Sequence, residues 1–436
     1  MRAFASDDEN GPNRVRRYTR FQPDQERNNV SRRVLGRHYA GRTPKHHAQP
    51  NQQWQPVFKE RFHPEIRRLK SGISTETRNI EQPTANVQWQ KSSWIEKLTF
   101  GDWYAAALRT RSAHWTFVTM FPNEITNPLA FEPIFIERIW GGRRLESEFH
   151  KKLPPQKRIG ESWEIVDRSE AQSVVAAGPL RGKTLHDLWT QHRQEIFGKV
   201  HDTPRFPLLI KILDAQEKLS LQVHPPERVA SRLGGEPKSE FWYVAAADPN
   251  AELFVGFRQP ITRDAFEESL NDGTMIDHIH RIAVRLGDAV FLPAGRVHAI
   301  GAGNLIIEIQ QNSDTTYRAF DWDRVDPKTG MKRDLHKDQA IQCIDFDDVQ
   351  PKLIQSQGEL LTSHRLFEIK KWNLNAARDA APVGQFAIVC CLTGSLSCAS
   401  AKFAPGEFFL VPAHLKDRKL KPLAADTSLL RVTIPV

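Results

Sequence analysis

Short apolar runs that alternate with polar positions dominate the chain from Phe131 onward, and Gly or Pro residues separate them. This pattern is typical of β-strands joined by tight turns. Residues 182–198 carry a helical stripe instead, with Thr184 placed to cap the helix. Helical patterns also occur at 225–235 and 262–282. The chain is therefore predicted to be mainly β, with a few helical insertions.

A weak internal repeat links two of the β-segments. Residues 286–300, LGDAVFLPAGRVHAI, are echoed by residues 405–419, PGEFFLVPAHLKDRK. Each copy has a Gly-acid turn, a four-residue apolar strand and a Pro-Ala pair, so the repeat predicts tandem jelly-roll barrels. The second copy has Asp417 where the first has His298, and we expect the second barrel to be structural.

Charge separates residues 1–119 from the remainder. The chain has a formal net charge of +9, and residues 1–119 hold 21 Lys+Arg against 11 Asp+Glu. This segment has few aliphatic residues and no sustained periodicity, so we expect a low-order extension. Its tryptophans and arginines are compatible with RNA or single-stranded DNA, and a transit peptide is a second interpretation. We favour a third, in which Met120 is the natural start.

Membrane and disulfide signals are weak throughout the sequence. No run of eighteen or more apolar residues occurs, so we expect no membrane span. No secretory segment follows Met1. The cysteines form no CxxC pair, which favours reduced thiols in a cytoplasmic protein. They are Cys343, Cys390, Cys391 and Cys398.

Polar side chains share one face of several predicted strands. In SLQVHPP (220–226), alternation places Ser220, Gln222 and His224 together, opposite an apolar face. In EPKSEFWYV (236–244), it places Lys238 and Glu240 together. A borderline metal such as zinc is suited by two imidazoles, a carboxylate and an amide oxygen, with one position left for water or substrate. The predicted metal-binding set is Gln222, His224, Glu240 and His298.

The sequence around these residues resembles a known family. The spacing Gly287-x5-Pro293-x-Gly295-x2-His298 resembles the second cupin motif. SLQVHPP, KSEFWYV, GRVHAIGAGNLIIEIQQNSDTTYRAFDW, ERIWGGRRL and IGESWEI closely resemble class I mannose-6-phosphate isomerases in their short bacterial form. The first cupin motif, HxH, is absent because Gln222 replaces its first histidine, which favours the isomerase over cupin dioxygenases.

The resemblance implies a fold, a reaction and a set of site residues. It implies tandem cupin barrels and one Zn²⁺ held by the metal-binding set. The implied reaction interconverts mannose 6-phosphate and fructose 6-phosphate through a cis-enediol. Either Lys238 or Glu308 would move the proton, and Arg318 would clamp the phosphate or stabilise the enediolate. Substrate contacts are implied for Ser220, Asp314 and Arg318.

These observations predict that the chain has three parts. We expect a basic extension at 1–119, a zinc-binding catalytic domain at 120–350 and a degenerate cupin domain at 351–436. The expected partner is a small sugar phosphate, with nucleic acid bound only through the extension, and we favour a monomer. Two alternatives stay open, a non-catalytic sugar-phosphate sensor and an isomerase for a different phospho-sugar.

Overall fold

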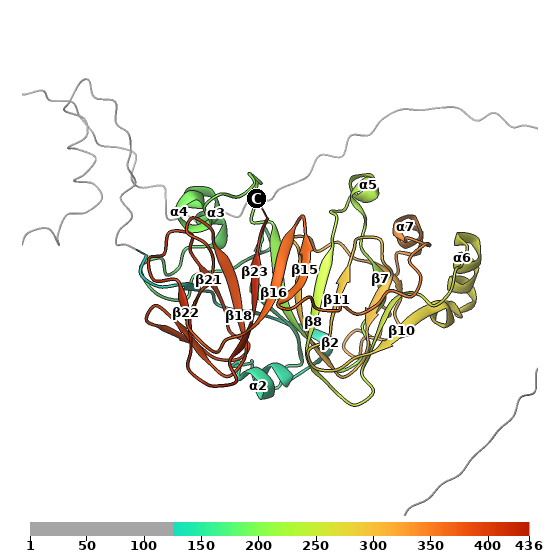
Figure 1. Ribbon diagram of the computed structural model, residues 1–436. Coiled ribbons are helices and arrows are strands. Elements are labelled where there is room, and N and C mark those ends of the chain that lie inside the picture. The colour runs from blue at the N-terminus through green and yellow to red at the C-terminus, as the bar shows by residue number, and fades with distance from the viewer. Residues whose placement is uncertain (1–124, 436) are drawn as a thin grey trace, which may run out of the picture. The chain divides into compact units, whose positions relative to one another are not determined.

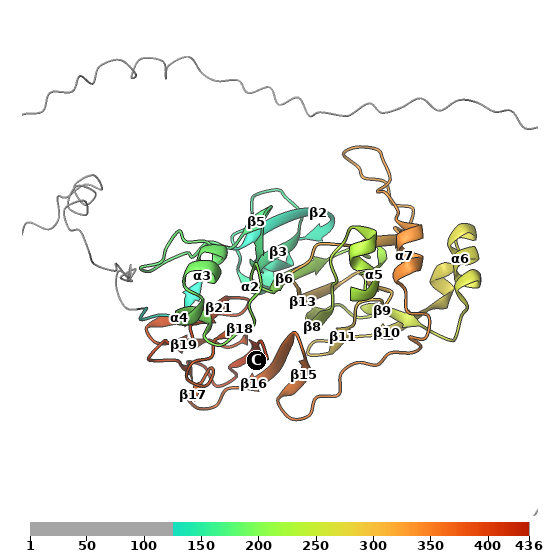
Figure 2. The ribbon, with the colours of Figure 1, turned by 90° about the horizontal axis from the view of Figure 1, so that it is seen from above.

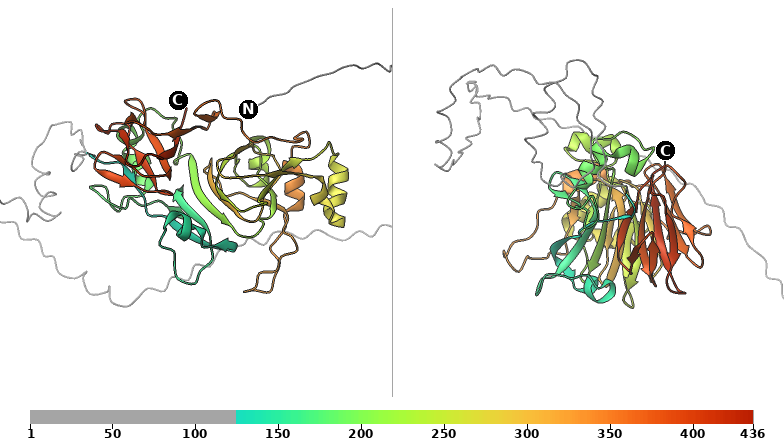
Figure 3. Two further views of the ribbon diagram at one scale, coloured as in Figure 1. Left: turned by 60° about the horizontal axis from the view of Figure 1, so that its bottom comes forward. Right: turned by 90° about the vertical axis from the view of Figure 1, so that its left-hand side faces the viewer.

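The computed structural model describes residues 125–435, so the predicted extension and Met120 lie outside the described residues. Antiparallel sheets dominate the described part, and they form two barrels that stand side by side (Figures 1 and 3). The prediction of a mainly β chain with tandem cupin barrels is confirmed. The described cysteines are all buried free thiols, as expected. Among the described helices, none is long and apolar enough to cross a membrane.

The first barrel consists of a six-stranded and a five-stranded sheet. Their strand orders are β11-β8-β13-β6-β3-β2 and β10-β9-β12-β7-β14. The strands of the first sheet are β2 (Ile134–Gly142), β3 (Ile159–Ile165), β6 (Leu208–Ala215), β8 (Glu240–Ala247), β11 (Ala289–Leu292) and β13 (Asn304–Gln311). Those of the second are β7 (Leu221–Val223), β9 (Glu252–Phe257), β10 (Ile279–Ala283), β12 (His298–Ile300) and β14 (Tyr317–Phe320).

The second barrel repeats this plan with a six-stranded and a four-stranded sheet. Their orders are β1-β21-β18-β23-β16-β15 and β17-β22-β19-β20. The first sheet contains β1 (Leu129–Ala130), β15 (Leu360–His364), β16 (Phe367–Asn373), β18 (Ala387–Thr393), β21 (Phe408–Val411) and β23 (Ser428–Thr433). The second contains β17 (Arg378–Asp379), β19 (Leu396–Cys398), β20 (Ala401–Phe403) and β22 (Lys419–Pro422). Two short strands, β4 (Asp167–Arg168) and β5 (Ala171–Gln172), pair with each other and lie outside both barrels' sheets.

The internal repeat occupies the same place in both barrels. Gly287 and Gly406 have positive φ angles of 94° and 79°, which an L side chain rarely adopts. Asp288 and Glu407 each accept a hydrogen bond from the backbone N–H three residues earlier, at 2.9 Å and 2.7 Å. Strands β11 and β21 follow, and they pair with β8 and β18 respectively. The repeat is therefore one structural unit used twice.

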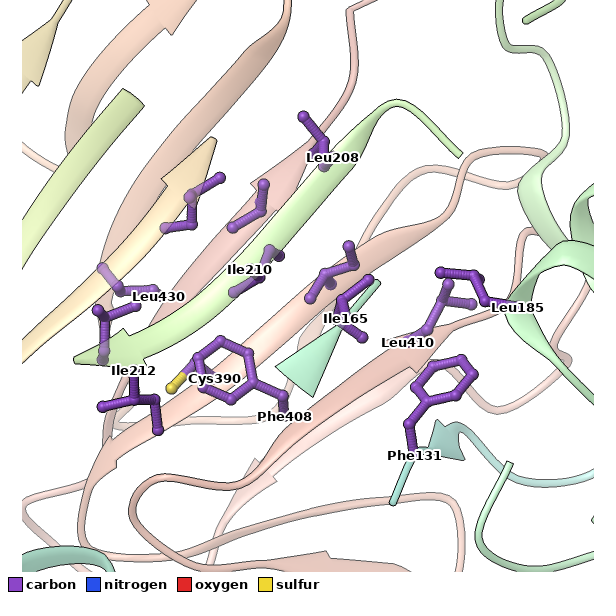
Figure 4. Close-up of a cluster of buried hydrophobic side chains, with 14 of the residues drawn as sticks. Phe131, Ile165, Leu185, Leu208, Ile210, Ile212, Cys390, Phe408, Leu410 and Leu430 are labelled. Atoms are coloured by element: carbon purple, nitrogen blue, oxygen red, sulfur yellow. The ribbon is translucent and has the colours of Figure 1, made fainter. Parts of the chain in front are cut away.

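The main hydrophobic core lies between the two barrels, where their six-stranded sheets face each other (Figure 4). Side chains alternate along each strand, so Ile307 and Ile309 of β13 enter this core while Glu308 points into the first barrel. In the second barrel, Ile388 and Cys390 of β18 belong to the same core. The outer face of the first barrel's six-stranded sheet is thus covered by the second barrel rather than by water.

Helices cover the outsides of the barrels (Figure 2). Thr184 and Asp187 form the expected capping box, but the predicted helix over 182–198 is broken at His192 into two. The 262–282 segment is α-helical only in its first half, continues as a short 3-10 helix at Met275–His278 and ends as strand β10. The α-helices are α2 (Arg144–Phe149), α3 (Leu185–Gln191), α4 (Arg193–Phe197), α5 (Glu227–Ala230), α6 (Arg263–Asp272) and α7 (Lys337–Cys343). The last three pack on the five-stranded sheet.

Replacing Phe197 with alanine is expected to cost about 3–5 kcal/mol of unfolding free energy, because a large cavity would open in a well-packed cluster. The Phe197 ring is fully buried. It lies 4.9 Å from the ring of Trp189 and 5.4 Å from that of Phe386 in the second barrel. Urea denaturation measures the change. Val383→Ala, at a position that is 86% exposed, is the control and should change stability little; equal effects would contradict the prediction.

Candidate active site

A cavity of about 460 Å³ opens between the two sheets of the first barrel. Strands β6 and β13 contribute Lys211 and Glu308 to its wall, and β7 and β14 contribute residues from the opposite sheet. A larger cavity of about 750 Å³ lies near Phe131 and Phe149 and contains none of the predicted site residues. The smaller cavity is lined by six of them: Ser220, Gln222, Lys238, Glu308, Asp314 and Arg318.

Three predicted metal ligands meet in the interior of the first barrel. The ligand atoms of His224, Glu240 and His298 all lie within 4.8 Å of one another. Glu240 Oε1 is 3.1 Å from His224 Nε2, and Glu240 Oε2 is 3.7 Å from His298 Nε2. The three residues are only 1–2% exposed. Two imidazoles and a carboxylate that converge in a buried space fit a divalent metal.

The backbone orients both imidazoles toward this point. His224 Nδ1 is 2.8 Å from the carbonyl oxygen of Thr315, and His298 Nδ1 is 2.9 Å from that of Arg296. Each Nδ1–H therefore donates outward, which leaves the Nε2 lone pair facing Glu240. Burial, with the nearby His224, lowers the pKa of His298 to about 3, so the ring is neutral. His298 Nε2 and Glu240 Oε2 are buried without a hydrogen bond, which fits a cation between them.

Gln222 lies beside this cluster on β7, between β12 and the edge strand β14 of the five-stranded sheet. Its backbone is in register with His298 of β12 on one side and Arg318 of β14 on the other. Cross-strand neighbours share a face of the sheet, so the three side chains lie in one row. Gln222 also lines the cavity. The Gln222 amide therefore lies between His298 of the metal-binding cluster and the guanidinium-bearing Arg318.

Lys238, one of the two candidate bases, lies against the metal-binding cluster. To act as a base it would need burial and a metal to lower its pKa. In this structure Lys238 Nζ lies 2.6 Å from Glu240 Oε1 and 3.4 Å from His224 Nε2. Burial alone would lower the pKa of Lys238, but the charges of Glu240 and Glu308 outweigh burial and raise it. Lys238 is thus placed as a protonated partner of Glu240, and its role as the proton-transferring base stays a prediction.

Glu308, the other candidate base, has a pKa suited to proton transfer near neutral pH. It is 4% exposed, faces the cavity and accepts a 3.2 Å hydrogen bond from the indole N–H of Trp242. Burial, together with the negative charge of Glu240, raises the pKa of Glu308 to about 7. A carboxyl group with such a pKa exchanges protons readily near neutral pH.

Lys211 and Glu161 are charged residues of the cavity wall that the sequence analysis did not single out. Lys211 Nζ lies 3.6 Å from Glu161 Oε2, 3.9 Å from Glu308 Oε1 and 3.9 Å from Asp314 Oδ1. Both new residues come from strands that are buried on both faces, PLLIKIL and IGESWEI. A charge within a fully buried strand was the available signal, because such a charge needs partners. Lys211 links three carboxylates across the cavity wall.

Glu161 should contribute stability that depends on pH. Burial alone would raise its pKa, but the charges of Lys211 and Arg138 outweigh burial and lower it from 4.5 to about 2. Because the folded pKa is the lower one, this stability is fully present above pH 4.5 and is lost as the pH falls toward 2. Glu161→Gln should therefore lose roughly 3 kcal/mol at neutral pH, at 1.36 kcal/mol per pKa unit.

Urea denaturation of wild type and Glu161→Gln over this pH range checks the prediction. The stability gap between the two proteins should shrink as the pH falls from 5 to about 3. Glu227→Gln is the control, because Glu227 forms an exposed ion pair with Arg365 that contributes little. A gap that stays constant with pH would contradict the assigned role of Glu161.

Known proteins are similar to this chain in sequence and in fold. Residues 129–253 match the family model of the type I phosphomannose isomerase catalytic domain. Mannose-6-phosphate isomerase ManA of Bacillus subtilis is 36% identical over 312 residues, which cover 69% of this chain and 97% of the relative. The mannose-6-phosphate isomerase of Streptococcus mutans is 36% identical over 301 residues, 65% of this chain and 94% of the relative.

A solved structure agrees with these relatives. The crystal structure of the mannose 6-phosphate isomerase from Bacillus subtilis superimposes with a TM-score of 0.63 at 33% identity, covering 71% of this chain and all of that one. The buried His-Glu-His cluster, the adjoining polar cavity and the tandem barrels thus occur in a chain that matches these enzymes over nearly their whole length. The chain belongs to the type I mannose-6-phosphate isomerase family of enzymes.

Proposed function

We propose that the chain is a zinc-dependent aldose–ketose isomerase that interconverts mannose 6-phosphate and fructose 6-phosphate through a cis-enediol. The observation that carries the proposal is the position of Glu308, whose ionisable carboxyl group faces the same cavity that the buried His224, Glu240 and His298 adjoin. A proton-transferring group and a metal-binding cluster at one cavity are what a 1,2-proton shift next to a sugar carbonyl requires.

The donor set supports zinc as the metal. Two neutral imidazoles and one carboxylate are typical of catalytic zinc sites, and Gln222 would supply an amide oxygen beside them. When bound, the metal would polarise the sugar oxygens as negative charge develops. The protonated side chain of Lys238, next to Glu240, would donate to the same oxygens.

Glu308 is the residue that we propose to move the proton between C2 and C1. Its pKa of about 7 lets it accept and return a proton within one turnover. The hydrogen bond from Trp242 holds its carboxyl group in place. Lys211, 3.9 Å away, would stabilise the ionised form before the proton is taken.

Arg318 and Ser220 are proposed to hold the substrate phosphate. Arg318 lines the cavity, and its Nη1 donates to the carbonyl oxygen of Asp334 at 2.8 Å. Its Nε is buried without a hydrogen-bond partner, so a donor stays available to a phosphate oxygen. Ser220 is buried and lines the same wall. Asp314 is proposed to bind sugar hydroxyls beside Lys211.

An assay of the purified full-length chain tests the proposal. Conversion of mannose 6-phosphate to fructose 6-phosphate should disappear after chelation and return on addition of zinc. Inactivity of folded, zinc-loaded protein toward mannose 6-phosphate would overturn the assignment. Turnover of another phospho-sugar would then indicate a different substrate, and tight binding without turnover would indicate a sensor.

A further inference from the structure

The second barrel has its own cavity, of about 730 Å³, and its wall is strongly basic. Asp379 is the carboxylate that lines it among the described residues. The indole of Trp372 forms part of the wall, with the guanidinium of Arg378 stacked 3.7 Å from the ring centroid. Five cationic residues line the cavity: Lys370, Arg378, Lys416, Arg418 and Arg431.

This cavity corresponds to the active-site cavity of the first barrel. The order β21-β18-β23-β16 in the second barrel repeats β11-β8-β13-β6 in the first. In the first barrel, Glu308 of β13 is in register with Lys211 of β6 and Trp242 of β8. In the second, Arg431 of β23 is in register with Lys370 of β16 and Val389 of β18. Arg431 therefore occupies the position of Glu308, and Lys370 that of Lys211.

The second barrel lacks counterparts of two metal-binding residues of the first barrel. Two residues before Trp242 on β8 stands Glu240, whereas two residues before Val389 on β18 stands Ala387. The repeat places Asp417 where the first barrel has His298. The second barrel has thus lost the carboxylate ligand and replaced the proton-transferring carboxylate by a guanidinium. These substitutions remove a cation site and create positive charge at the same place.

The two most buried cations are held in place mainly by backbone carbonyl oxygens. Arg418 and Arg431 are each 7% exposed. Arg418 donates to the carbonyl oxygens of Pro382 at 3.0 Å and Leu415 at 2.8 Å. Arg431 Nε donates to the carbonyl oxygen of Ala380, and its Nη1 lies 3.5 Å from Glu368. Carbonyl acceptors orient a guanidinium without neutralising it, so positive charge remains at the cavity wall.

The carboxylates around the cavity balance only part of this charge. Glu359 pairs with Arg378 at 2.6 Å, and Glu368 with Lys370 at 2.9 Å. Asp379 pairs with Lys419, which lies outside the cavity lining, at 3.3 Å. Lys416 aside, five described cations thus face three carboxylates: Lys370, Arg378, Arg418, Lys419 and Arg431. An excess of fixed positive charge in a concave site, on an aromatic wall, attracts small anions.

We propose that the second barrel binds a phosphate-bearing small molecule in this cavity. Arginine forks recognise phosphate oxygens with two parallel hydrogen bonds, and Lys370 and Lys416 add point charges. The volume suits a small metabolite rather than a macromolecule. The site is separate from the isomerase centre, so the proposal does not depend on the assigned reaction.

Titration calorimetry of the full-length chain with inorganic phosphate, at constant ionic strength, tests the proposal. The cavity variant is Arg378→Gln/Lys416→Gln, which changes exposed or half-exposed side chains. The matched control is Lys402→Gln/Lys421→Gln, which removes two exposed cations of the same barrel outside this cavity. Both variants keep the same first barrel, so phosphate binding there contributes equally to the two titrations.

The cavity variant should bind phosphate about tenfold more weakly than wild type, or lose one phosphate per chain, and the control should match wild type. Its basal isomerase activity should not change. Equal phosphate binding by the two double variants would overturn the proposal, as would binding that equimolar chloride abolishes. The single variant Arg378→Gln gives the same comparison if the double variant melts early. Competition by fructose 6-phosphate or adenosine diphosphate then distinguishes a sugar phosphate from a nucleotide.

Discussion

Glu308→Gln is expected to lower the turnover number for mannose 6-phosphate isomerisation by about 10²–10⁴-fold, the usual contribution of a positioned general base. Glutamine keeps the size of the side chain and can still bond to the indole of Trp242, but it cannot accept the substrate proton. The carboxyl group of Glu308 lies outside the His-Glu-His cluster, so metal content should stay at the wild-type level. Steady-state kinetics with metal analysis on the same samples measure both quantities.

The matched control for Glu308→Gln is Glu359→Gln, which makes the same chemical change in the second barrel, where Glu359 forms a half-exposed ion pair with Arg378. Its activity should equal that of wild type. Lys238→Gln separates the two candidate bases. If Glu308→Gln stays active while Lys238→Gln, with full metal content, loses turnover, then the proton passes through Lys238 and our assignment is wrong.

His298→Ala is expected to lose the bound metal and, with it, the isomerase activity. Removal of a ligand leaves two protein donors from the cluster, His224 and Glu240, and should weaken metal binding by more than the 10–100-fold typical of lost outer contacts. Activity should fall by about 10³-fold, because Lewis-acid stabilisation amounts to several kcal/mol. Atomic emission spectrometry after dialysis, followed by the isomerase assay, measures both losses.

His280→Ala is the control for this variant, because His280 is a half-buried histidine of β10 in the same barrel but outside the metal-binding cluster. It should retain one metal ion per chain and full activity. A dialysed His298→Ala protein that still holds one ion per chain would show that the metal is bound elsewhere. Unfolding curves of the metal-free proteins separate metal loss from misfolding, since His298 is buried.

Strand alternation was a sufficient guide to the inward-facing site residues. Glu308 follows and precedes isoleucines that pack between the barrels, so its side chain must point the other way, into the cavity. The same rule placed Lys238 and Glu240 on one face, and their charged groups are 2.6 Å apart. Periodicity of two is a property of the extended backbone, so it could be read without knowing which strands pair.

The sequence was a poorer guide where long-range packing decides the outcome. The stripe over 182–198 indicated one helix, but the structure divides it at His192, where the chain turns so that Phe197 packs against Phe386 of the second barrel. Burial on both faces hides the period-two signal of β3 and β6. For that reason alternation alone did not single out Glu161 and Lys211.

The sequence by itself determined the β-class, the duplicated unit, the metal-binding residue types and the family, because turn residues, alternation and motif spacing are local properties of the chain. Only the tertiary structure decided the charge state and partners of each group. Lys238 is paired with Glu240, and Glu308 has a pKa near 7. Such properties depend on desolvation and on charges brought close from distant strands, and no local pattern encodes those distances.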